Sequence, residues 1–320
     1  MREICNHEYC AFCAQALCRR SRKVRSLIAP ARKGKNVGAV HDLRVASRRL
    51  RSALSLLGPC HPDSQTWRRQ VRKLTRRLGQ ARDLDVQLAY LTRQAQKSPT
   101  NRQGLEDLLA RLRRGRQAAQ EKLLAVLKRL RPTELLADME RRLCPPRLRA
   151  ERSVLGVEGY RQAAGHIGLL LEDLLCYAPH VANPQAMRQH HRMRIAAKHL
   201  RYALEILQPL YGRSLRRAIS AARQLQSLLG ELHDCDVWLE FLPDYLARLG
   251  GRGHVRRAAQ AGAAVGELMR DRQSRREALY RRFVALWIDL ETKRVWPNLQ
   301  KTLAKAPLEY RGRRPARPSP

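Results

Sequence analysis

Apolar residues recur every three or four positions along most of the chain, and almost no stretch alternates apolar and polar residues as a strand would. Leu, Ala, Arg, Gln and Glu, which favour helices, dominate these stretches. The pattern predicts an all-α protein. The expected helices of the first half span residues 4–27, 40–57, 64–79 with a continuation in a new phase beyond Asp83, and 101–130. Those of the second half span 154–177, a segment from Asn183, a segment from Ser214, and a last long helix after Gly253.

Local signals set the expected boundaries of these helices. Asp63 is positioned to cap one helix, and Asn183-Pro184 supplies an N-cap and an N1 proline for another. Cys144-Pro145-Pro146 is the clearest internal break, because consecutive prolines cannot continue a helix. We therefore expect a first half over 1–143, a linker over 144–153, a second half over 154–306 and a disordered basic tail over 307–320, with each half long enough to bury its own core.

One basic motif occurs twice at helical spacing. It reads His41-x-x-Arg44-x-x-x-Arg48-x-x-Arg51, and it returns 150 residues later as His191-x-x-Arg194-x-x-x-Lys198-x-x-Arg201. At about 100° per residue these four positions fall within roughly 80° of one another, so they form a stripe. The apolar residues repeat in the same phase on a separate face. We interpret the pair as two copies of one site, produced by an internal duplication.

A second element repeats with nearly the same displacement. Leu78-Gly79-x-x-Arg82-Asp83-x-Asp85-Val86 corresponds to Leu229-Gly230-x-x-His233-Asp234-x-Asp236-Val237. Basic residues precede the first copy at Arg69, Arg72 and Arg76, and only Arg72 keeps a cationic counterpart, Arg223. The paired aspartates come where a new helical segment is expected to start. This position favours capping and salt bridges to the Arg stripe over acid–base catalysis or metal binding.

The net charge of +36 exceeds what solubility requires, and both halves are basic. Such a charge points to a polyanionic partner, and the excess of Arg over Lys suits bidentate contacts to phosphate. A GC-rich genome that encodes Arg wherever a cation is tolerated would give the same composition. No signal peptide and no membrane span is expected, so the protein is predicted to be cytoplasmic, with its eight cysteines reduced. Cys10-x-x-Cys13 has metal-ligand spacing but lacks a second pair, which favours core cysteines, and no metal or other cofactor is expected.

These two repeated blocks resemble the signature of the conserved histidine α-helical domain family, abbreviated CHAD. The resemblance covers the chain from the first helix to about residue 305. It implies two four-helix bundles related by a pseudo-twofold axis, with basic helices lining a central groove or pore that binds inorganic polyphosphate. It also implies association with polyphosphate granules and with polyphosphate-metabolising enzymes. The chain lacks the Glu-x-Glu-x-Lys motif of the triphosphatase domain fused to some family members, so it resembles a binding module and not an enzyme.

The expected ligand contacts are charge-assisted hydrogen bonds from the two stripes and from basic residues nearby. His41 and His191 are expected to donate as imidazolium, stabilised by the anion; the alternative is that they are interhelical hydrogen-bonding residues and that the stripe is a solvated face. The candidate polyphosphate-binding residues are His41, Arg44, Arg48, Arg51, Arg72, Arg76, His191, Arg194, Lys198, Arg201 and Arg223.

Two other functions are compatible with the charge. Nucleic-acid binding is the first alternative, although no aromatic residues are interleaved with the basic stripe and no helix-turn-helix or zinc-finger spacing occurs. Weak non-specific nucleic-acid binding is expected in either case. A phosphohydrolase that uses the duplicated histidines is the second alternative, but no nucleophile–base arrangement can be identified in the sequence.

Overall fold

The computed structural model describes residues 6–32, 37–57, 60–97, 99–129, 132–143, 155–250 and 255–311, and these residues are mostly helical and include no strand. The all-α prediction is confirmed. The helices of the first half are α1 (His7–Arg32), α2 (Val37–Leu57), α3 (Ser64–Ala95), α4 (Pro99–Arg129) and α5 (Pro132–Leu143). Those of the second half are α6 (Val157–Leu175), α7 (Met187–Tyr211), α8 (Arg216–Gly250), α9 (Val255–Thr292) and α10 (Val295–Arg311), with a short 3-10 helix at Ala178–His180.

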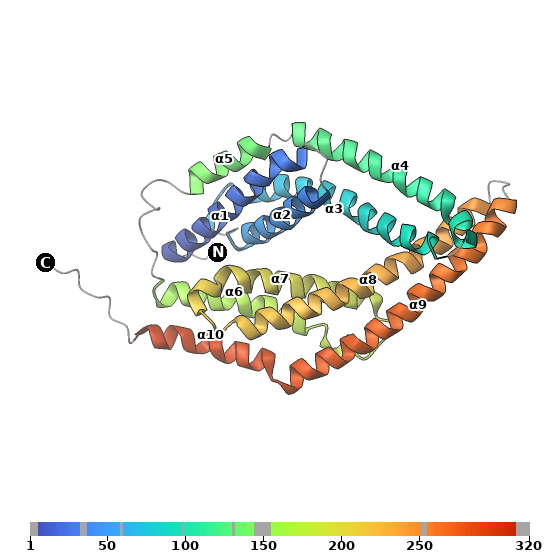
Figure 1. The fold of residues 1–320 in the computed structure, drawn as a ribbon. Helices are drawn as coiled ribbons and strands as arrows, with labels where there is room; N and C mark the ends of the chain where they lie inside the picture. The colour runs from blue at the N-terminus through green and yellow to red at the C-terminus, as the bar shows by residue number, and fades with distance from the viewer. Residues whose placement is uncertain are drawn as a thin grey trace.

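The order of helix contacts is the same in the two halves. In the first half α1 packs on α2, α2 on α3, α3 on α4, and α5 returns to α1; in the second, α6 packs on α7, α7 on α8, α8 on α9, and α10 returns to α6. The halves meet where α2 lies against α7 and α1 against α6, and again at the distant end where α4 lies against α9 (Figure 1). The two motif helices, α2 and α7, therefore face each other near the middle of the molecule.

Both hydrophobic cores are shared between the halves. The larger core contains Leu17, Leu50 and Leu78 from the first half together with Ile167 and Leu200 from the second. The smaller core, where the long helices converge, combines residues of α3 and α4 with residues of α8 and α9. This differs from the expectation that each half buries its own core. The apolar faces of α2 and α7 extend into one continuous interior, so neither half is closed without the other.

Three local features expected at helix ends differ from the structure. Asp63 occupies the N-cap of α3 but makes no cap hydrogen bond, because its carboxylate pairs with Arg142 Nη1 at 2.8 Å. The helix does not change phase near Asp83 but continues unbroken through Gly79 to Ala95. The Asn183-Pro184 signal forms a turn in which Asn183 Oδ1 accepts from the Gln185 amide at 2.9 Å, and α7 begins four residues later than Asn183.

The segment boundaries fall partly outside the described residues. The predicted linker over 144–153 lies there entirely. The predicted disordered tail overlaps α10, which continues as a helix to Arg311, while residues 312–320 are not described. The short helix α5 and the separate helix α10 were not anticipated.

The cysteines differ in one respect from the expectation that all are reduced. Cys10 and Cys60 form a disulfide, with Cα atoms 5.5 Å apart across 50 residues of sequence, a distance typical of such bonds. Cys13, Cys18 and Cys235 are buried, as small apolar core residues are expected to be. Within the described ranges no three His, Cys, Asp or Glu side chains gather closely enough to hold a metal ion. None of the helices in those ranges combines the length and apolarity that crossing a membrane requires.

Candidate functional site

The basic stripes of α2 and α7 meet in one groove, about 530 Å³ in volume, whose other walls are α3 and α8. We call it the central groove. It holds five Arg or Lys side chains against two carboxylates, so its charge is positive. Its described lining residues are His41, Arg44, Arg48, Arg82, Asp83, Val86, Gln87, Arg194, Ile195, Lys198, Gln226, His233, Asp234, Val237 and Trp238.

The middle of the central groove concentrates cations that no acid neutralises. Arg48 and Lys198 hold the same motif position in the two helices, and both are partly buried. Neither forms an ion pair within the part of the chain that the structure describes. Burial, followed by the positive charges of Arg48, Arg51 and Arg194, lowers the pKa of Lys198 to about 8. Arg44, by contrast, already contacts Asp83 at 3.3 Å. An anion placed between Arg48 and Lys198 would relieve this repulsion.

A second hollow of about 640 Å³ continues the groove between α2, α3 and α7. We call it the open basic pocket; it shares Ile195 and Lys198 with the central groove, so the two form one basic track. Its described walls carry five Arg or Lys side chains and no carboxylate. Burial, followed by the charges of Lys198, Arg51 and Arg68, lowers the pKa of His199 to about 4. The lining residues are Arg51, Ser52, Ser55, Gln65, Arg68, Arg69, Arg72, Ile195, Lys198 and His199.

A third hollow, of about 600 Å³, lies on the other side of α2, between that helix, α1 and α7. We call it the Glu205 pocket, after one of the two carboxylates on its wall, the other being that of Asp42. Glu205 pairs with Arg201 at 3.0 Å, with Arg223 at 3.7 Å and with Arg49 at 3.9 Å. The described lining residues are Arg19, Arg20, Lys23, Leu27, His41, Asp42, Val45, Ala46, Arg49 and Glu205. The protein's own Glu205 therefore neutralises part of the positive charge here.

The two motif histidines have different surroundings. His41 is exposed and lines both the central groove and the Glu205 pocket. His191 packs against His233, with ring centroids 4.0 Å apart, and it is His233 that lines the groove. Burial, together with Arg194 and Lys198, lowers the pKa of His191, and burial lowers that of His233 to about 4. In the unliganded protein both are therefore neutral near pH 7, so the expected imidazolium at His191 does not form without an anion.

The repeated aspartates lie inside α3 and α8 and cap no helix, which corrects that expectation. Asp83 forms an ion pair with the stripe, through Arg44, and the charge of Asp234 acts on Arg194. Asp85 instead pairs with Arg116 of α4 at 2.5 Å, and Asp236 pairs with Arg276 of α9 at 2.6 Å. These two pairs occupy corresponding places in the two halves and tie the motif-bearing bundle to the long outer helices.

The structure brings together seven of the eleven predicted site residues on the basic track. They are His41, Arg44, Arg48, Arg51, Arg72, Arg194 and Lys198. Four lie elsewhere: Arg76 is exposed on α3 and lines none of the three hollows, His191 packs behind His233, and Arg201 and Arg223 pair with Glu205.

The track also includes basic residues that were not selected from the sequence. They are Arg68, Arg69, Arg82, His199 and His233. The sequence could have identified Arg82 and His233 as site residues, because a basic or titratable residue precedes the same aspartate in both repeats. Arg68 and His199 stand outside the repeated spacing, and only the pocket enclosed by α2, α3 and α7 reveals them.

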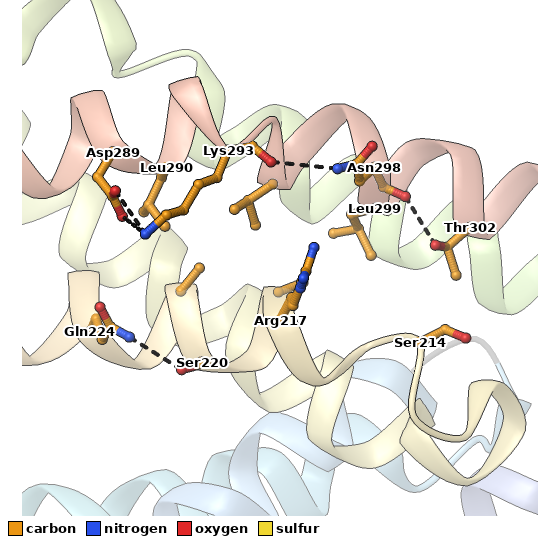
Figure 2. Close-up of a pocket in the computed structure, with 13 residues that line it drawn as sticks. Ser214, Arg217, Ser220, Gln224, Asp289, Leu290, Lys293, Asn298, Leu299 and Thr302 are labelled. Carbon is orange, nitrogen blue, oxygen red and sulfur yellow. Dashed lines mark hydrogen bonds and ion pairs between the residues drawn. The ribbon is translucent and has the colours of Figure 1, made fainter.

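A further pocket of about 510 Å³ lies away from the track, between the start of α8 and the α9–α10 corner (Figure 2). Arg217 extends into it, toward Asn298 and Leu299. Lys293, on the opposite wall, is held by Asp289 at 2.8 Å. Because one of its two cations is paired, this pocket carries less uncompensated charge than the track.

Comparison with known proteins identifies the family. A family model for the CHAD domain matches residues 15–243, which is well over half of the chain. The crystal structure of the CHAD domain from the plant Ricinus communis is similar, with 28% sequence identity, a TM-score of 0.59, and coverage of 84% of this chain and 90% of that chain. Comparison with curated proteins gives no match. The repeated basic motifs, the helical architecture and the family model agree, and the chain belongs to the CHAD domain family.

Proposed function

We propose that this protein binds inorganic polyphosphate along the track formed by the central groove and the open basic pocket. The observation that carries the proposal is the cluster of Arg48, Arg51 and Lys198, which is partly buried, crowded with like charge and without a carboxylate partner in the described residues. A protein gains nothing in stability from gathering unpaired cations in this way. The arrangement is favourable only when an anion is bound.

Polyphosphate suits such a track because its anionic units repeat along a flexible chain. Guanidinium groups of Arg48, Arg51 and Arg72 offer planar pairs of donors to phosphate oxygens, and Lys198 offers a point charge between the two halves. Binding stabilises the charged form of Lys198 and so raises its pKa from about 8. The family resemblance implies the same ligand.

Nucleic acid is the second candidate, since any linear polyanion is attracted to this charge. The lining of the track argues against a site built for bases. Trp238 is the large aromatic ring among its described lining residues, yet it is 5% exposed and packs against Tyr90 with centroids 5.4 Å apart. A buried ring offers no face on which a base can stack.

The protein is proposed to act by binding and not by catalysis. Its cytoplasmic setting, its presence on polyphosphate granules and its association with polyphosphate-metabolising enzymes are parts of the same proposal. Two partly buried histidines on the track, His199 and His233, support a binding role, because their pKa values of about 4 make them poor general acids at neutral pH.

Competition at physiological salt tests the function. The protein is bound to fluorescent long-chain polyphosphate, then challenged with unlabelled polyphosphate or with RNA of equal total charge. We expect polyphosphate to displace the probe at a concentration at least tenfold lower than RNA, with log K falling linearly as log salt rises. Equal displacement by both polymers would assign the track to polyanions in general, and an affinity insensitive to salt would contradict the cationic track.

A further inference from the structure

The two halves carry residues of different charge at one corresponding position. Four residues after Arg51, on the next turn of α2, stands Ser55; four residues after Arg201, on the next turn of α7, stands Glu205. Ser55 is neutral, and its hydroxyl donates to the Ser52 carbonyl of its own helix at 2.6 Å. It lines the open basic pocket and leaves the cations there unpaired.

Glu205 does the opposite in its own half. Its side chain is 18% exposed, and it lies among the guanidinium groups of Arg201, Arg223 and Arg49. Two of these are the counterparts of track residues, since Arg201 corresponds to Arg51 and Arg223 to Arg72. The carboxylate also acts on Arg20 in α1, whose pKa falls to about 10 chiefly because of burial and of the neighbouring Arg19 and Arg49, and which Glu205 partly restores.

We infer that Glu205 is an internal anion that occupies, in the second half, the position equivalent to one that a phosphate group takes in the first. This inference rests on the proposed function, and it adds that the ligand contacts Arg51 and Arg72 but not their counterparts in the second half. A polyphosphate chain lies in the open basic pocket and the central groove, and it does not engage Arg201 and Arg223, because the protein's own carboxylate already binds them.

The inference explains why the duplicated motif does not give two equal sites. Arg201 is 14% exposed and faces Glu205, whereas Arg51 faces the hollow shared with Arg68 and Lys198. One carboxylate therefore determines that Arg51 is available to a ligand and that its counterpart Arg201 is not. It also compensates three arginines that would otherwise repel one another in a partly buried place.

Reciprocal exchange of the two residues tests the inference on the full chain, with long-chain polyphosphate as the probe. Glu205→Ser frees Arg201 and Arg223, so we expect affinity to rise about tenfold and the slope of log K against log salt to steepen by about one to two phosphates. Ser55→Glu supplies a competing anion to Arg51 and Arg72, so we expect affinity to fall about tenfold. The double exchange should bind nearly as tightly as the unmodified protein.

The outcomes separate this inference from the function on which it rests. If the unmodified chain does not bind polyphosphate, the proposed function fails. If the unmodified chain binds and Ser55→Glu weakens binding, but Glu205→Ser leaves affinity and salt slope unchanged, Glu205 has a structural role only and the inference is overturned. Should Glu205→Ser fold poorly, Glu205→Gln keeps the side-chain shape and removes the charge. We expect its unliganded Tm to fall and its polyphosphate-dependent rise in Tm to exceed that of the unmodified chain; an equal rise would overturn the inference.

Discussion

The open basic pocket and the Glu205 pocket are both bounded by α2 and α7, yet they differ in available charge. The described walls of the first carry cations and no carboxylate, whereas Glu205, on the wall of the second, pairs with Arg49 and with Arg201 and Arg223 beside it. This difference arises at one pair of corresponding residues outside the basic motif, which is Ser55 in the first half and Glu205 in the second. Repetition of a motif therefore does not establish repetition of a site, because the nearest counter-ion decides whether a cation is free to bind a ligand.

The largest effect is expected where the two halves contribute jointly. Replacing Arg48 and Lys198 together with Glu should weaken polyphosphate binding a hundredfold or more, because two charge-assisted contacts of roughly 1.5–3 kcal/mol each are lost and repulsion is added. Both side chains lie on the groove and off the apolar face, so helix content should be unchanged. Binding is measured by fluorescence titration and helix content by circular dichroism.

The matched control reverses the same amount of charge outside the track. Arg217 and Arg282 are exposed and line neither the central groove nor the open basic pocket. Arg217→Glu with Arg282→Glu should reduce affinity only slightly. Equal losses in the two double variants would mean that net charge alone governs binding, and unfolding of the groove variant would make Arg48 and Lys198 structural residues.

The two corresponding ion pairs that link α3 to α4 and α8 to α9 differ in burial and should differ in their contribution to stability. The side chains of Asp236 and Arg276 are each 7% exposed, whereas those of Asp85 and Arg116 are 14% and 19% exposed. Asp236→Ala leaves Arg276 buried and unpaired, so we expect a loss of about 3–5 kcal/mol in the free energy of unfolding. Asp85→Ala should cost less, because water partly solvates Arg116. Urea denaturation monitored by circular dichroism checks both, and a larger loss from Asp85→Ala would contradict the ranking by burial.

Another comparison uses the corresponding residues Arg72 and Arg223. Arg72 lines the open basic pocket, and Arg223 contacts Glu205. Arg72→Glu should weaken polyphosphate binding about tenfold, whereas Arg223→Glu should change it less than twofold. The two variants carry the same change in net charge and serve as each other's control. Equal effects in a binding titration would show that Arg223 contacts the ligand as Arg72 does.

The smallest effect is a dependence on pH. Lys198 has a pKa of about 8, so it is largely charged below pH 8 and loses its proton above it. Because the anion favours the charged form, affinity should be highest below pH 8 and fall severalfold between pH 7.5 and pH 9. His199, with a pKa of about 4, is neutral throughout this interval, and the arginines stay charged. Lys198→Arg should flatten the profile; a profile unchanged by that substitution would remove Lys198 from the ligand contacts.

The sequence predicted the helices and the stripe because both follow from periodicity. Val40 to Leu57 was expected to be helical, and α2 ends at Leu57. The spacing that places Arg44, Arg48 and Arg51 on one face holds in the structure because apolar packing fixes the rotation of the helix.

The remaining features depend on tertiary contacts that no local pattern specifies. Asp63 was expected to cap α3, but Arg142, 79 residues away, takes its carboxylate. Cys10 meets Cys60 because α1 packs on α2. For Asp63 and Cys10 the partner comes from a distant part of the chain, so packing decides the role of the residue. Arg201 pairs with Glu205 of its own helix at i+4, which the sequence displays, but the approach of Arg49 and Arg223 to the same glutamate depends on packing.

The sharing of both cores has a mechanical consequence. The four helices that line the groove, α2, α3, α7 and α8, all contribute to the larger core, and α3 and α8 also contribute to the smaller core with α4 and α9, so packing holds every wall of the groove in place. The walls of the groove are therefore already at the separation that the bound ligand requires, so little of the binding free energy is lost in rearranging them. The same bracing makes the halves interdependent. If the chain is cut between Leu143 and Leu155, the two fragments are expected to remain associated and folded. Either half alone would expose its apolar faces and is expected to self-associate.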